Sequence, residues 1–587
     1  MAPLRLFPIP PRITFRAPST HCPDCGEVLK VHKTHTRWVS TLHIGTFRAR
    51  EIILACPACG RRYLSEELSR LVPSGARFGY DVLVYVGRAL FLRYRNEEEV
   101  VAELAERNIR ISPREVSVLG RKFIVYLALA HQRCSPRIQQ AMQPRGGYVL
   151  HLDGTKEGAS PLLMSSLDSL SEIVLGNVKV PAESEEHIVP FLQRIKETFG
   201  IPLALVHDMG AGILKAVAKV FPNVADFICH FHFLRDIGND LMGEDYDRLR
   251  QRLRKHEIHA KLRAHAKALQ RRIEPCLLAQ LAAGISDRLP SDTQREIFPR
   301  ASAYSLILWT LEGKKQGDGY GFPFDRPHLS FAKRIQHLYR LLDQMKDVQL
   351  RGQWRDNMPY FDLLNDLRAV VEDAHLEQAV QNLEGHILIF DRLRQALRIA
   401  LPAGSRGLND EGSEGNIRSI EQRVKAFRAW LTARPEYPQN RKAASLIAQL
   451  DKHWAKLFAD PITVQTPSGP VTIQPQRTNN LLEQFFRYLK RAHRRRTGQA
   501  STSRLLRTML AEAPLVKNLQ NPAYLALLLD GKATIEEVFA DIDIATVREE
   551  ARRLQRDFDP IPPTIKRLVG KPDYPEKLLA MLKTAAA

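Results

Sequence analysis

The pattern of apolar and polar positions changes period along the chain and divides it into segments. Residues 20–65 alternate in the way of paired strands, and residues 66–145 carry apolar positions at helical spacing. Residues 146–239 alternate short apolar strands with amphipathic helices, which predicts a mixed α/β sheet. Residues 240–475 and 500–587 are almost entirely helical in pattern. The fold class that follows is multidomain α+β.

Capping and turn residues sharpen three of these segments. Residues 1–19 are rich in proline and show no period, so no element is expected there. Ser112, Pro113 and Glu115 have the spacing of a capping box, which predicts a helix that begins at Pro113. The apolar run 225–232 predicts one more strand of the sheet.

Residues 476–499 contain an amphipathic helix with an uneven distribution of charge. Leu482, Phe485, Phe486 and Leu489 form one apolar stripe at helical spacing. The head of the helix carries a single acid, Glu483, and a run of basic residues follows it. An ion pair from Glu483 to the next turn would contribute only about 0.2–0.5 kcal/mol and does not account for that run. The basic residues are Arg487, Lys490, Arg491, Arg494, Arg495 and Arg496.

The charge balance indicates the kind of partner. The chain has 86 Lys and Arg against 65 Asp and Glu, a formal net charge of +21. Such an excess favours a polyanion, nucleic acid before an anionic membrane surface. No apolar run approaches the roughly 18 residues that a membrane span needs, and prolines and arginines interrupt the N-terminus where a signal peptide would be apolar. We therefore expect a soluble, cytoplasmic protein that associates with the nucleoid when bound to DNA and does not enter a membrane.

Four of the seven cysteines form two matching pairs, CPDCG and CPACG. Four thiolates suit tetrahedral zinc, and four protein ligands leave no open position for catalysis. We therefore expect a structural zinc ribbon, and reduced thiols agree with an intracellular protein. Cys134 and Cys276 have no partner in pattern and are expected to be plain buried thiols. The predicted zinc ligands are Cys22, Cys25, Cys56 and Cys59.

The helices of residues 66–145 allow two interpretations. A helix-turn-helix would direct Arg114, Ser117, Arg121 and Lys122 toward DNA. A plain helical hairpin would instead pack through the apolar positions of the same helix, and the sequence does not decide between the two. Those apolar positions are Val116, Leu119, Phe123 and Leu127.

Two aspartates are expected to end apolar strands of the α/β segment. Asp153 ends the strand within 146–155, and Asp208 ends the strand within 201–210. Ligand sites of open α/β sheets lie at such strand ends, and neighbouring carboxylates suit Mg²⁺. Capping of the next helix is the alternative role for Asp208, whereas a loop and strands follow Asp153. A third acid would complete a two-metal site for attack on phosphate, and Glu483 has the right setting.

These stretches resemble a known family. HLDGT (151–155), VHDMGAGILKAVAKVFPNVADFICHFH (206–232) and TNNLLEQFFRYLKRAHRRRTG (478–498) resemble the DDE transposases of bacterial insertion sequences, most closely the Mutator-like superfamily. The resemblance implies a ribonuclease H-like domain, 146–239 with 476–499, that is interrupted by a helical insertion, 240–475. Its catalytic acids would be Asp153, Asp208 and Glu483, which would bind Mg²⁺ or Mn²⁺, and its C-x-x-H motif would be Cys229 and His232.

One departure from the family concerns the third acid. The separation of Asp208 and Glu483 is 275 residues (483 − 208), which is long for these enzymes. Glu411 and Glu414, in a Gly-rich loop, are the alternatives to Glu483. Cys229 and His232 are expected to brace the sheet against the insertion, because two ligands alone rarely hold a metal.

The resemblance implies a DNA transposase that cuts at transposon ends and transfers the freed strand into target DNA. Its partners would be double-stranded DNA and further copies of the chain on paired ends. Residues 20–132 would recognise the end sequence, and the basic insertion and helix would hold the DNA backbone. The alternatives are a non-enzymatic zinc-ribbon DNA-binding regulator, as in a domesticated transposase, and a structure-specific nuclease on the same fold.

Overall fold

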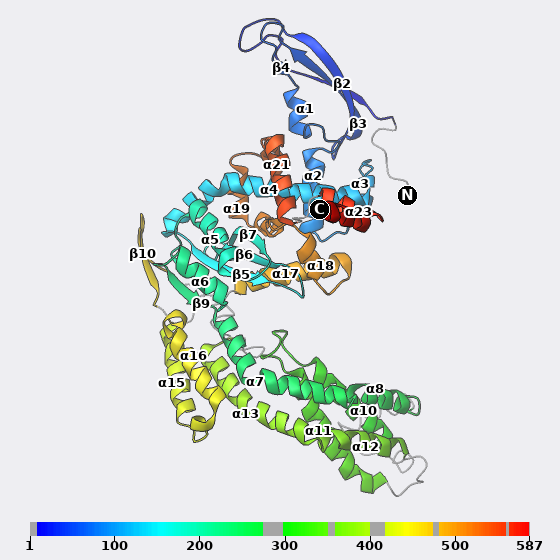
Figure 1. The fold of residues 1–587 in the computed structure, drawn as a ribbon, viewed down its shortest axis with the longest axis vertical. Helices are drawn as coiled ribbons and strands as arrows, with labels where there is room; N and C mark the ends of the chain where they lie inside the picture. The colour runs from blue at the N-terminus through cyan, green and yellow to red at the C-terminus, as the bar shows by residue number, and fades with distance from the viewer. Residues whose placement is uncertain are drawn as a thin grey trace, which may run out of the picture. The chain divides into compact units, whose positions relative to one another are not determined.

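The computed structural model describes residues 9–273, 298–349, 358–399, 417–458, 460–473, 480–558 and 563–585. The chain forms two compact units. The first contains residues 1–226, 461–475 and 479–587, and the second contains residues 227–460 and 476–478. The expected multidomain α+β class is confirmed (Figure 1).

The first unit begins with a β-ribbon built from four strands. They are β1 (Arg12–Arg16), β2 (Lys30–Thr41), β3 (Gly45–Ala55) and β4 (Arg62–Tyr63). β2 and β3 form the expected antiparallel hairpin, β1 lies parallel to β3 on its other side, and β4 also pairs with β3. The expectation that residues 1–19 form no element is wrong, because β1 completes the sheet and buries Phe15 beside Phe47. One face of this sheet packs on α1 (Glu66–Leu71) through Leu68.

Three helices follow the ribbon: α2 (Tyr80–Phe91), α3 (Glu97–Ala105) and α4 (Pro113–Met142). The predicted capping box at the start of α4 is confirmed. The Ser112 hydroxyl accepts the Glu115 N–H at 3.2 Å, and the Glu115 carboxylate accepts the Ser112 N–H at 3.0 Å. Beyond its first turns α4 is buried on most sides, so it serves as a central helix of the unit.

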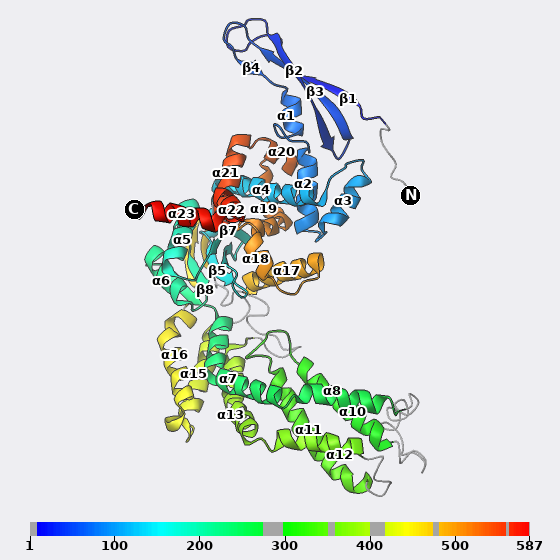
Figure 2. The same ribbon diagram turned by 45° about the vertical axis from the view of Figure 1, so that its right-hand side comes forward.

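A five-stranded mixed sheet forms the middle of the first unit. Its strands are β5 (Val149–Thr155), β6 (Leu162–Asp168), β7 (Ile173–Val180), β8 (Ala204–His207) and β9 (Ala225–Ile228), in the order β7-β6-β5-β8-β9. β6 is antiparallel to β5 and β7, whereas β8 is parallel to β5. The helices α5 (Glu185–Phe199) and α6 (Ala211–Val220) pack side by side, as both views show (Figure 2), and a short turn, η1 (Gln143–Arg145), precedes β5.

The C-terminal part of the chain completes the first unit. It contains α17 (Asn480–Thr497), α18 (Ser503–Thr508), η6 (Ala513–Gln520), α19 (Pro522–Leu529), α20 (Ile535–Ala540), α21 (Ile544–Phe558), α22 (Pro563–Val569) and α23 (Tyr574–Ala585). α17 packs on β5, and α19, α20 and α21 pack on α4. The Asn518 side chain pairs with the backbone of Val174 through two hydrogen bonds of 2.8 Å, which satisfies the edge strand β7.

The second unit is helical in the residues that the structure describes. Its helices are α7 (His230–Lys255), α8 (Ile258–Gln270), α10 (Phe298–Glu312), η3 (Gly313–Lys315), α11 (Pro327–Gln349), α12 (Met358–Val371), α13 (Ala374–Leu397), α15 (Ile417–Thr432), η5 (Tyr437–Gln439) and α16 (Arg441–Leu457). α7 packs along α13 and is tied to its N-terminus, since Asp373 accepts from Arg252 and His256, each at 2.7 Å. No described helix is both long and apolar enough to span a bilayer.

Two boundaries differ from the sequence predictions. The strand predicted at 225–232 stops at Ile228, and helix α7 begins at His230. The helical pattern predicted to continue to 475 stops before a β-hairpin of β10 (Ile462–Thr466) and β11 (Gly469–Ile473), which belongs to the first unit. The first error arises because short apolar runs do not distinguish a strand from a helix.

Candidate functional site

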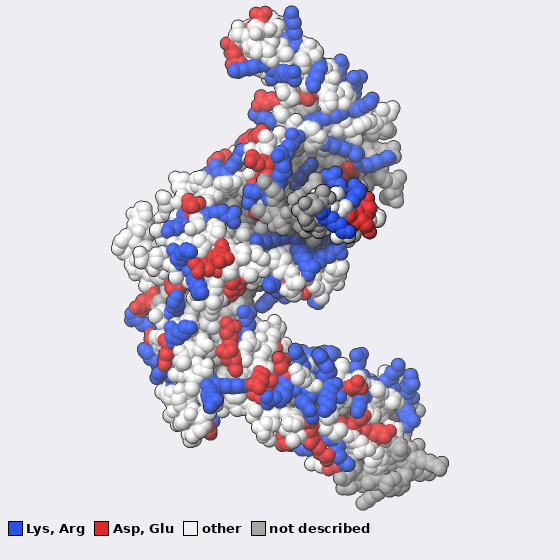
Figure 3. All heavy atoms as spheres, viewed as in Figure 1, with Lys and Arg blue, Asp and Glu red and all other residues white. Residues whose placement is uncertain are grey.

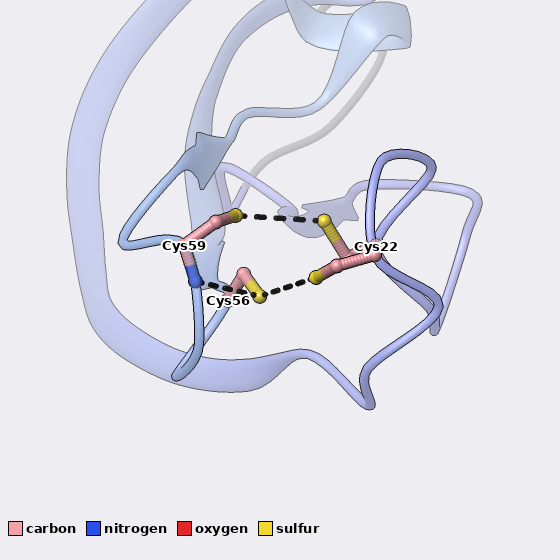
Figure 4. Close-up of side chains that lie close together, drawn as sticks. Cys22, Cys56 and Cys59 are labelled. Atoms are coloured by element: carbon pink, nitrogen blue, oxygen red, sulfur yellow. Dashed lines mark hydrogen bonds between the residues drawn. The ribbon is translucent and has the colours of Figure 1, made fainter.

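The two CxxC pairs meet at the end of the ribbon that lies away from α1. Sγ of Cys22 lies 3.7 Å from Sγ of Cys59, and Sγ of Cys25 lies 3.4 Å from Sγ of Cys56 (Figure 4). All four sulfur atoms lie within 4.8 Å of one another. Four thiolates around tetrahedral zinc at about 2.3 Å would stand about 3.8 Å apart, so the cluster is consistent with a zinc site.

The surroundings of the cluster lower the pKa of the Cys22 and Cys56 thiols and raise the pKa of the Cys25 and Cys59 thiols, because each lowered cysteine shares a hydrogen bond with a raised one. The backbone N–H of Cys59 points at Sγ of Cys56 at 3.4 Å, and the Tyr63 hydroxyl lies 3.1 Å from Sγ of Cys22. The hydrogen bond from Tyr63 lowers the pKa of the Cys22 thiol to about 6. These contacts fix the orientation of the ligands, a role that outer hydrogen bonds serve in metal sites.

Asp153 and Asp208 occupy matching positions on neighbouring strands. In the parallel pair β5 and β8, Val149 lies level with Ala204 and His151 lies level with Val206. The paired register ends at His151 and Val206, and its extension by two residues brings Asp153 level with Asp208, which follows the last residue of β8. Side chains at level positions of adjacent strands point to the same face. On this extended register the two carboxylates point to the same face of the sheet.

The strand end predicted at Asp153 is wrong, because β5 continues to Thr155. Asp153 is therefore a carboxylate inside a strand, with 4% of its surface exposed, and it pairs with Ser165 of β6. Its Oδ1 accepts the Gly154 N–H at 2.7 Å. A carboxylate buried this deeply requires a favourable partner, because desolvation of its charge is costly.

Asp208 is half-buried and lies just ahead of α6. Its Oδ1 accepts the Gly210 N–H at 3.1 Å, but the N-cap of α6 is Gly210, which makes no side-chain capping bond. Asp208 is therefore not the N-cap of α6. Its carboxylate instead accepts a hydrogen bond from the N-cap residue, in the turn that leads into the helix.

A polar row crosses the sheet at the level of these two aspartates. Asp153 pairs with Ser165, and Ser165 pairs with Asn177 of β7. Ser165 and Asn177 are buried, and the Ser165 hydroxyl donates to Oδ1 of Asn177 at 2.7 Å. The row thus runs from Asn177 through Ser165 and Asp153 to Asp208 on a single face. Sequence analysis missed Ser165 and Asn177, although a polar residue inside an apolar strand was a usable signal.

The polar row faces the α17–α18 segment. Gly176 precedes Asn177 and therefore presents its Cα hydrogens to the opposite face of the sheet. On that face it lies beside Phe191 and Ile195 of α5. Lys179, two residues beyond Asn177 and on the same face as the row, donates to the backbone carbonyls of Arg507 and Met509 at the end of α18. The sheet therefore has α5 on one face and the α17–α18 segment on the face that carries the aspartates.

Glu483 lies in the first turn of α17, the helix that packs on β5. The predicted apolar stripe is confirmed, because Leu482, Phe485 and Phe486 are buried in the core. The Glu483 side chain is outside the described residues, as are Glu411, Glu414 and Cys276. The hydrogen bonds from Thr502 and, to a smaller extent, the charge of Lys490, two helical turns beyond Glu483, lower the pKa of Glu157, which lies two residues after β5. The exposed stripe of α17 thus runs past the end of β5.

His207 and Asp226 form a chain of contacts that ends at the backbone of Asp208. Neither residue was predicted from the sequence. Nδ1 of the buried His207 donates to the Asp208 carbonyl at 2.7 Å. Nε2 of His207 lies 3.4 Å from the Asp226 carboxylate on β9. These contacts fix the backbone at Asp208. Sequence showed His207 next to Asp208, but only the strand order reveals its contact with Asp226.

Asp168 shows what a purely structural strand-end acid looks like in this sheet. It is fully buried, and its carboxylate accepts the N–H groups of Val149, Leu170 and Ser171, each at 3.1 Å. Burial raises its pKa, and these hydrogen bonds oppose that rise. Asp168 therefore closes the end of β6 and has no place in the polar row.

Cys229 and His232 lie at the start of α7 and not on a strand. Cys229 is the N-cap residue, and both side chains are buried. Burial lowers the pKa of His232 to about 3, which keeps its imidazole neutral. Both residues belong to the second unit, and no group of three or more metal-ligand side chains includes them in the part of the chain that the structure describes.

The α3–α4 segment shows the packing that the plain hairpin interpretation requires. The four apolar positions, Val116, Leu119, Phe123 and Leu127, are buried in the core. Arg114, Arg121 and Lys122 are exposed on the first three turns of α4. The Ser117 hydroxyl donates to Glu97 of α3 at 3.2 Å and so is engaged within the protein. Along α17, Arg487, Lys490, Arg491, Arg494 and Arg495 are exposed and Arg496 is half-buried.

Comparison of the chain with protein-family models and with curated proteins finds no match.

Proposed function

We propose that the chain is a DNA transposase that uses divalent metal ions, Mg²⁺ or Mn²⁺, to cut DNA at transposon ends and to transfer the freed strand into target DNA. The observation that supports this proposal most is the parallel register of β5 and β8, because its extension by two residues brings Asp153 level with Asp208. The mixed sheet also agrees with the ribonuclease H-like domain that the resemblance implies. We expect the protein to act as an oligomer on paired DNA ends.

Asp153, Asp208 and Glu483 would hold the metal ions, because carboxylate oxygens are the ligands that Mg²⁺ prefers. Such ions supply Lewis acidity and an activated water for in-line displacement at phosphate. The hydrogen bond from His207 to the Asp208 carbonyl holds one ligand in place. The exposed basic residues of α17 lie on the helix that packs on β5, where they would position the DNA backbone.

The test is Mg²⁺-dependent cleavage of duplex DNA that carries the inverted repeats flanking the gene. We expect Asp153→Asn and Asp208→Asn each to lower the cleavage rate by on the order of 10³-fold, since a lost metal ligand removes several kcal/mol of transition-state stabilisation. DNA affinity should stay unchanged in both variants. Glu197→Gln, an exposed acid on α5 of the same unit, is the matched control and should cleave normally.

Other results would support the alternative functions. Duplex binding without cleavage by the unmodified chain, unchanged by Asp153→Asn, would indicate a DNA-binding regulator. Cleavage of branched or damaged DNA with no preference for the repeats would indicate a nuclease on this fold. Either result would contradict the transposase proposal.

A further inference from the structure

One face of the ribbon sheet is not used by the ribbon core. Alternate residues of a strand point to opposite faces, and Phe47 and Ala49 of β3 point to the core that packs on α1. The residues between and beyond them point away from that core. We name this side the outer ribbon face. It consists of three rows across β1, β3 and β2, namely Arg12–Arg48–Trp38, Thr14–Arg50–Thr36 and Arg16–Ile52–Thr34.

The outer ribbon face concentrates positive charge without any acid. Its rows contain four arginines and no Asp or Glu. Among the described residues, none of these arginines forms an ion pair with a carboxylate. The Nε atom of Arg50 is buried and has no hydrogen-bond partner among the same residues. Figure 3 shows Lys and Arg side chains along the ribbon at the top of the view.

On the inner face of the same sheet, the charged side chains have hydrogen-bond partners within the protein. Glu51 is buried and accepts the Ser65 N–H at 3.3 Å, and Arg37 donates to the Ala76 carbonyl at 2.6 Å. Arg12 and Arg48, by contrast, stand directly opposite each other on the outer ribbon face. Like charges on neighbouring strands repel each other, so an anion bound at this face would stabilise the cluster.

The remaining positions suit contact with a nucleic-acid backbone. Trp38 is 46% exposed, and the Arg48 guanidinium lies 5.2 Å from the centre of its ring, a cation–π contact that orients the guanidinium. The three threonines are exposed and carry short hydroxyl donors. Phosphate oxygens commonly accept hydrogen bonds from Arg, Lys, Ser and Thr.

The width of the outer ribbon face bears on which part of a DNA duplex it would contact. The major groove admits an α-helix or a two-stranded ribbon. The outer ribbon face is three strands wide, with neighbouring strands about 4.8 Å apart, so it is broader than the two-stranded ribbon that the groove is known to admit. This width, together with the arginines and threonines of the face, favours contact with the sugar–phosphate backbone.

We propose that the outer ribbon face binds the phosphate backbone of duplex DNA and does not read base sequence. The inference rests on the proposed function for the choice of DNA as the polyanion. It assigns a backbone-holding role to the ribbon, where sequence analysis had expected recognition of the end sequence. The DNA contact residues that it adds are Arg12, Arg16, Arg48, Arg50 and Trp38.

The experiment measures the affinity of the full-length chain for a labelled duplex of random sequence over a range of salt concentrations, without Mg²⁺ so that no strand is cut. We expect Arg12→Ala/Arg48→Ala to weaken binding about tenfold at moderate salt. The slope of log affinity against log salt should fall by about 1.8, since each lost phosphate contact removes about 0.9. A duplex carrying the inverted repeat should lose the same factor.

The matched control removes two charges from the other side of the ribbon. Lys33→Ala/Arg70→Ala changes an exposed residue of β2 that points away from the outer ribbon face and an exposed residue of α1. It should leave both affinity and slope unchanged. Zinc content and the unfolding midpoint are compared first, so that only folded variants with bound zinc are scored.

Three outcomes would overturn the proposal. Equal losses in the two double variants would indicate a general charge effect. No loss in Arg12→Ala/Arg48→Ala would show that the face does not hold DNA. A loss confined to the inverted-repeat duplex would show that the face reads sequence. None of these depends on cleavage, so failure of this proposal is distinct from failure of the transposase proposal, which the aspartate variants test.

Discussion

The cysteine cluster and the carboxylate row are built in opposite ways. The cluster draws its four ligands from two short turns of one ribbon, which the hairpin of β2 and β3 brings together. The row draws Asp153 and Asp208 from strands that are neighbours only because the sheet order is β7-β6-β5-β8-β9. A site of the first kind can be recognised from spacing alone. A site of the second kind requires the register of a sheet.

The largest effect should come from loss of zinc, which tests whether the ribbon depends on its own ligands. We expect Cys56→Ser or a zinc chelator to unfold the ribbon, because structural zinc contributes about 10–16 kcal/mol in small zinc domains. The five-stranded sheet should keep its structure, since the ribbon supplies no buried residue of its core and only the half-buried Leu42 packs against it. Hydrogen exchange of residues 20–65 against residues 146–180 measures the difference. Equal exchange in both regions after zinc removal would contradict it.

The next effect concerns the third member of the carboxylate site. If Glu483 completes the site, Glu483→Gln should lower DNA cleavage by about 10²–10³-fold with unchanged DNA affinity. Glu411→Gln and Glu414→Gln serve as paired controls and should cleave normally. A cleavage defect in either control, with Glu483→Gln unaffected, would move the third acid to the segment before α15.

A smaller effect is expected at the capping box of α4, a local motif like the cysteine pairs. Ser112→Ala removes the acceptor of the Glu115 N–H and should cost about 1 kcal/mol in the free energy of unfolding. Urea unfolding measures the difference. Ser69→Ala is the control, since its hydroxyl bonds only to backbone carbonyls within α1 and it should change stability much less. An equal loss of unfolding free energy in both variants would contradict the assignment of Ser112 as a stabilising helix cap.

The smallest effect concerns Glu157, a contact between distant segments like the carboxylate row. Its carboxylate accepts the Thr502 N–H at 2.8 Å and also the Thr502 hydroxyl, and these bonds lower its pKa to about 2. The folded-state pKa is below the ordinary value of 4.5, so the contribution is present above pH 4.5 and is lost as the pH falls toward 2.

The measurement is the difference in urea midpoint between the unmodified chain and Glu157→Gln at several pH values. We expect a small positive difference at pH 7 that disappears between pH 4.5 and pH 2. Glu172→Gln, which changes an exposed acid in the turn between β6 and β7, is measured in parallel as the control. A difference for Glu157→Gln that stays constant down to pH 2 would contradict the assigned role.

Sequence reasoning succeeded where chemistry and structure are local. The capping box at Ser112, the hairpin of β2 and β3, and the apolar stripe of α17 were all predicted and are confirmed. It fails at short apolar runs. The pattern predicts that β5 ends at Asp153, two residues before its actual end, and that a strand continues past Ile228, where helix α7 begins instead. In those places the pattern was compatible with two conformations, and only the neighbouring elements select one.

For the candidate site, sequence identified both aspartates but not what surrounds them. Ser165, Asn177, His207 and Asp226 became visible only when their strands were placed side by side. The polar interruptions in β6 and β7 were present in the sequence, but without a register nothing linked them to Asp153.

The sequence by itself determined the cysteine cluster, the helix caps, the excess of positive charge and the identity of the two acids, because each depends on residues close together in the chain or on composition. The tertiary structure decided which residues share a face. It made the strands before Asp208 and around Asp153 neighbours, turned the polar row toward the α17–α18 segment and gathered four arginines on the outer ribbon face. The physical reason is that strand order and register join residues distant in sequence, and a one-residue slip would send each of them to the opposite face.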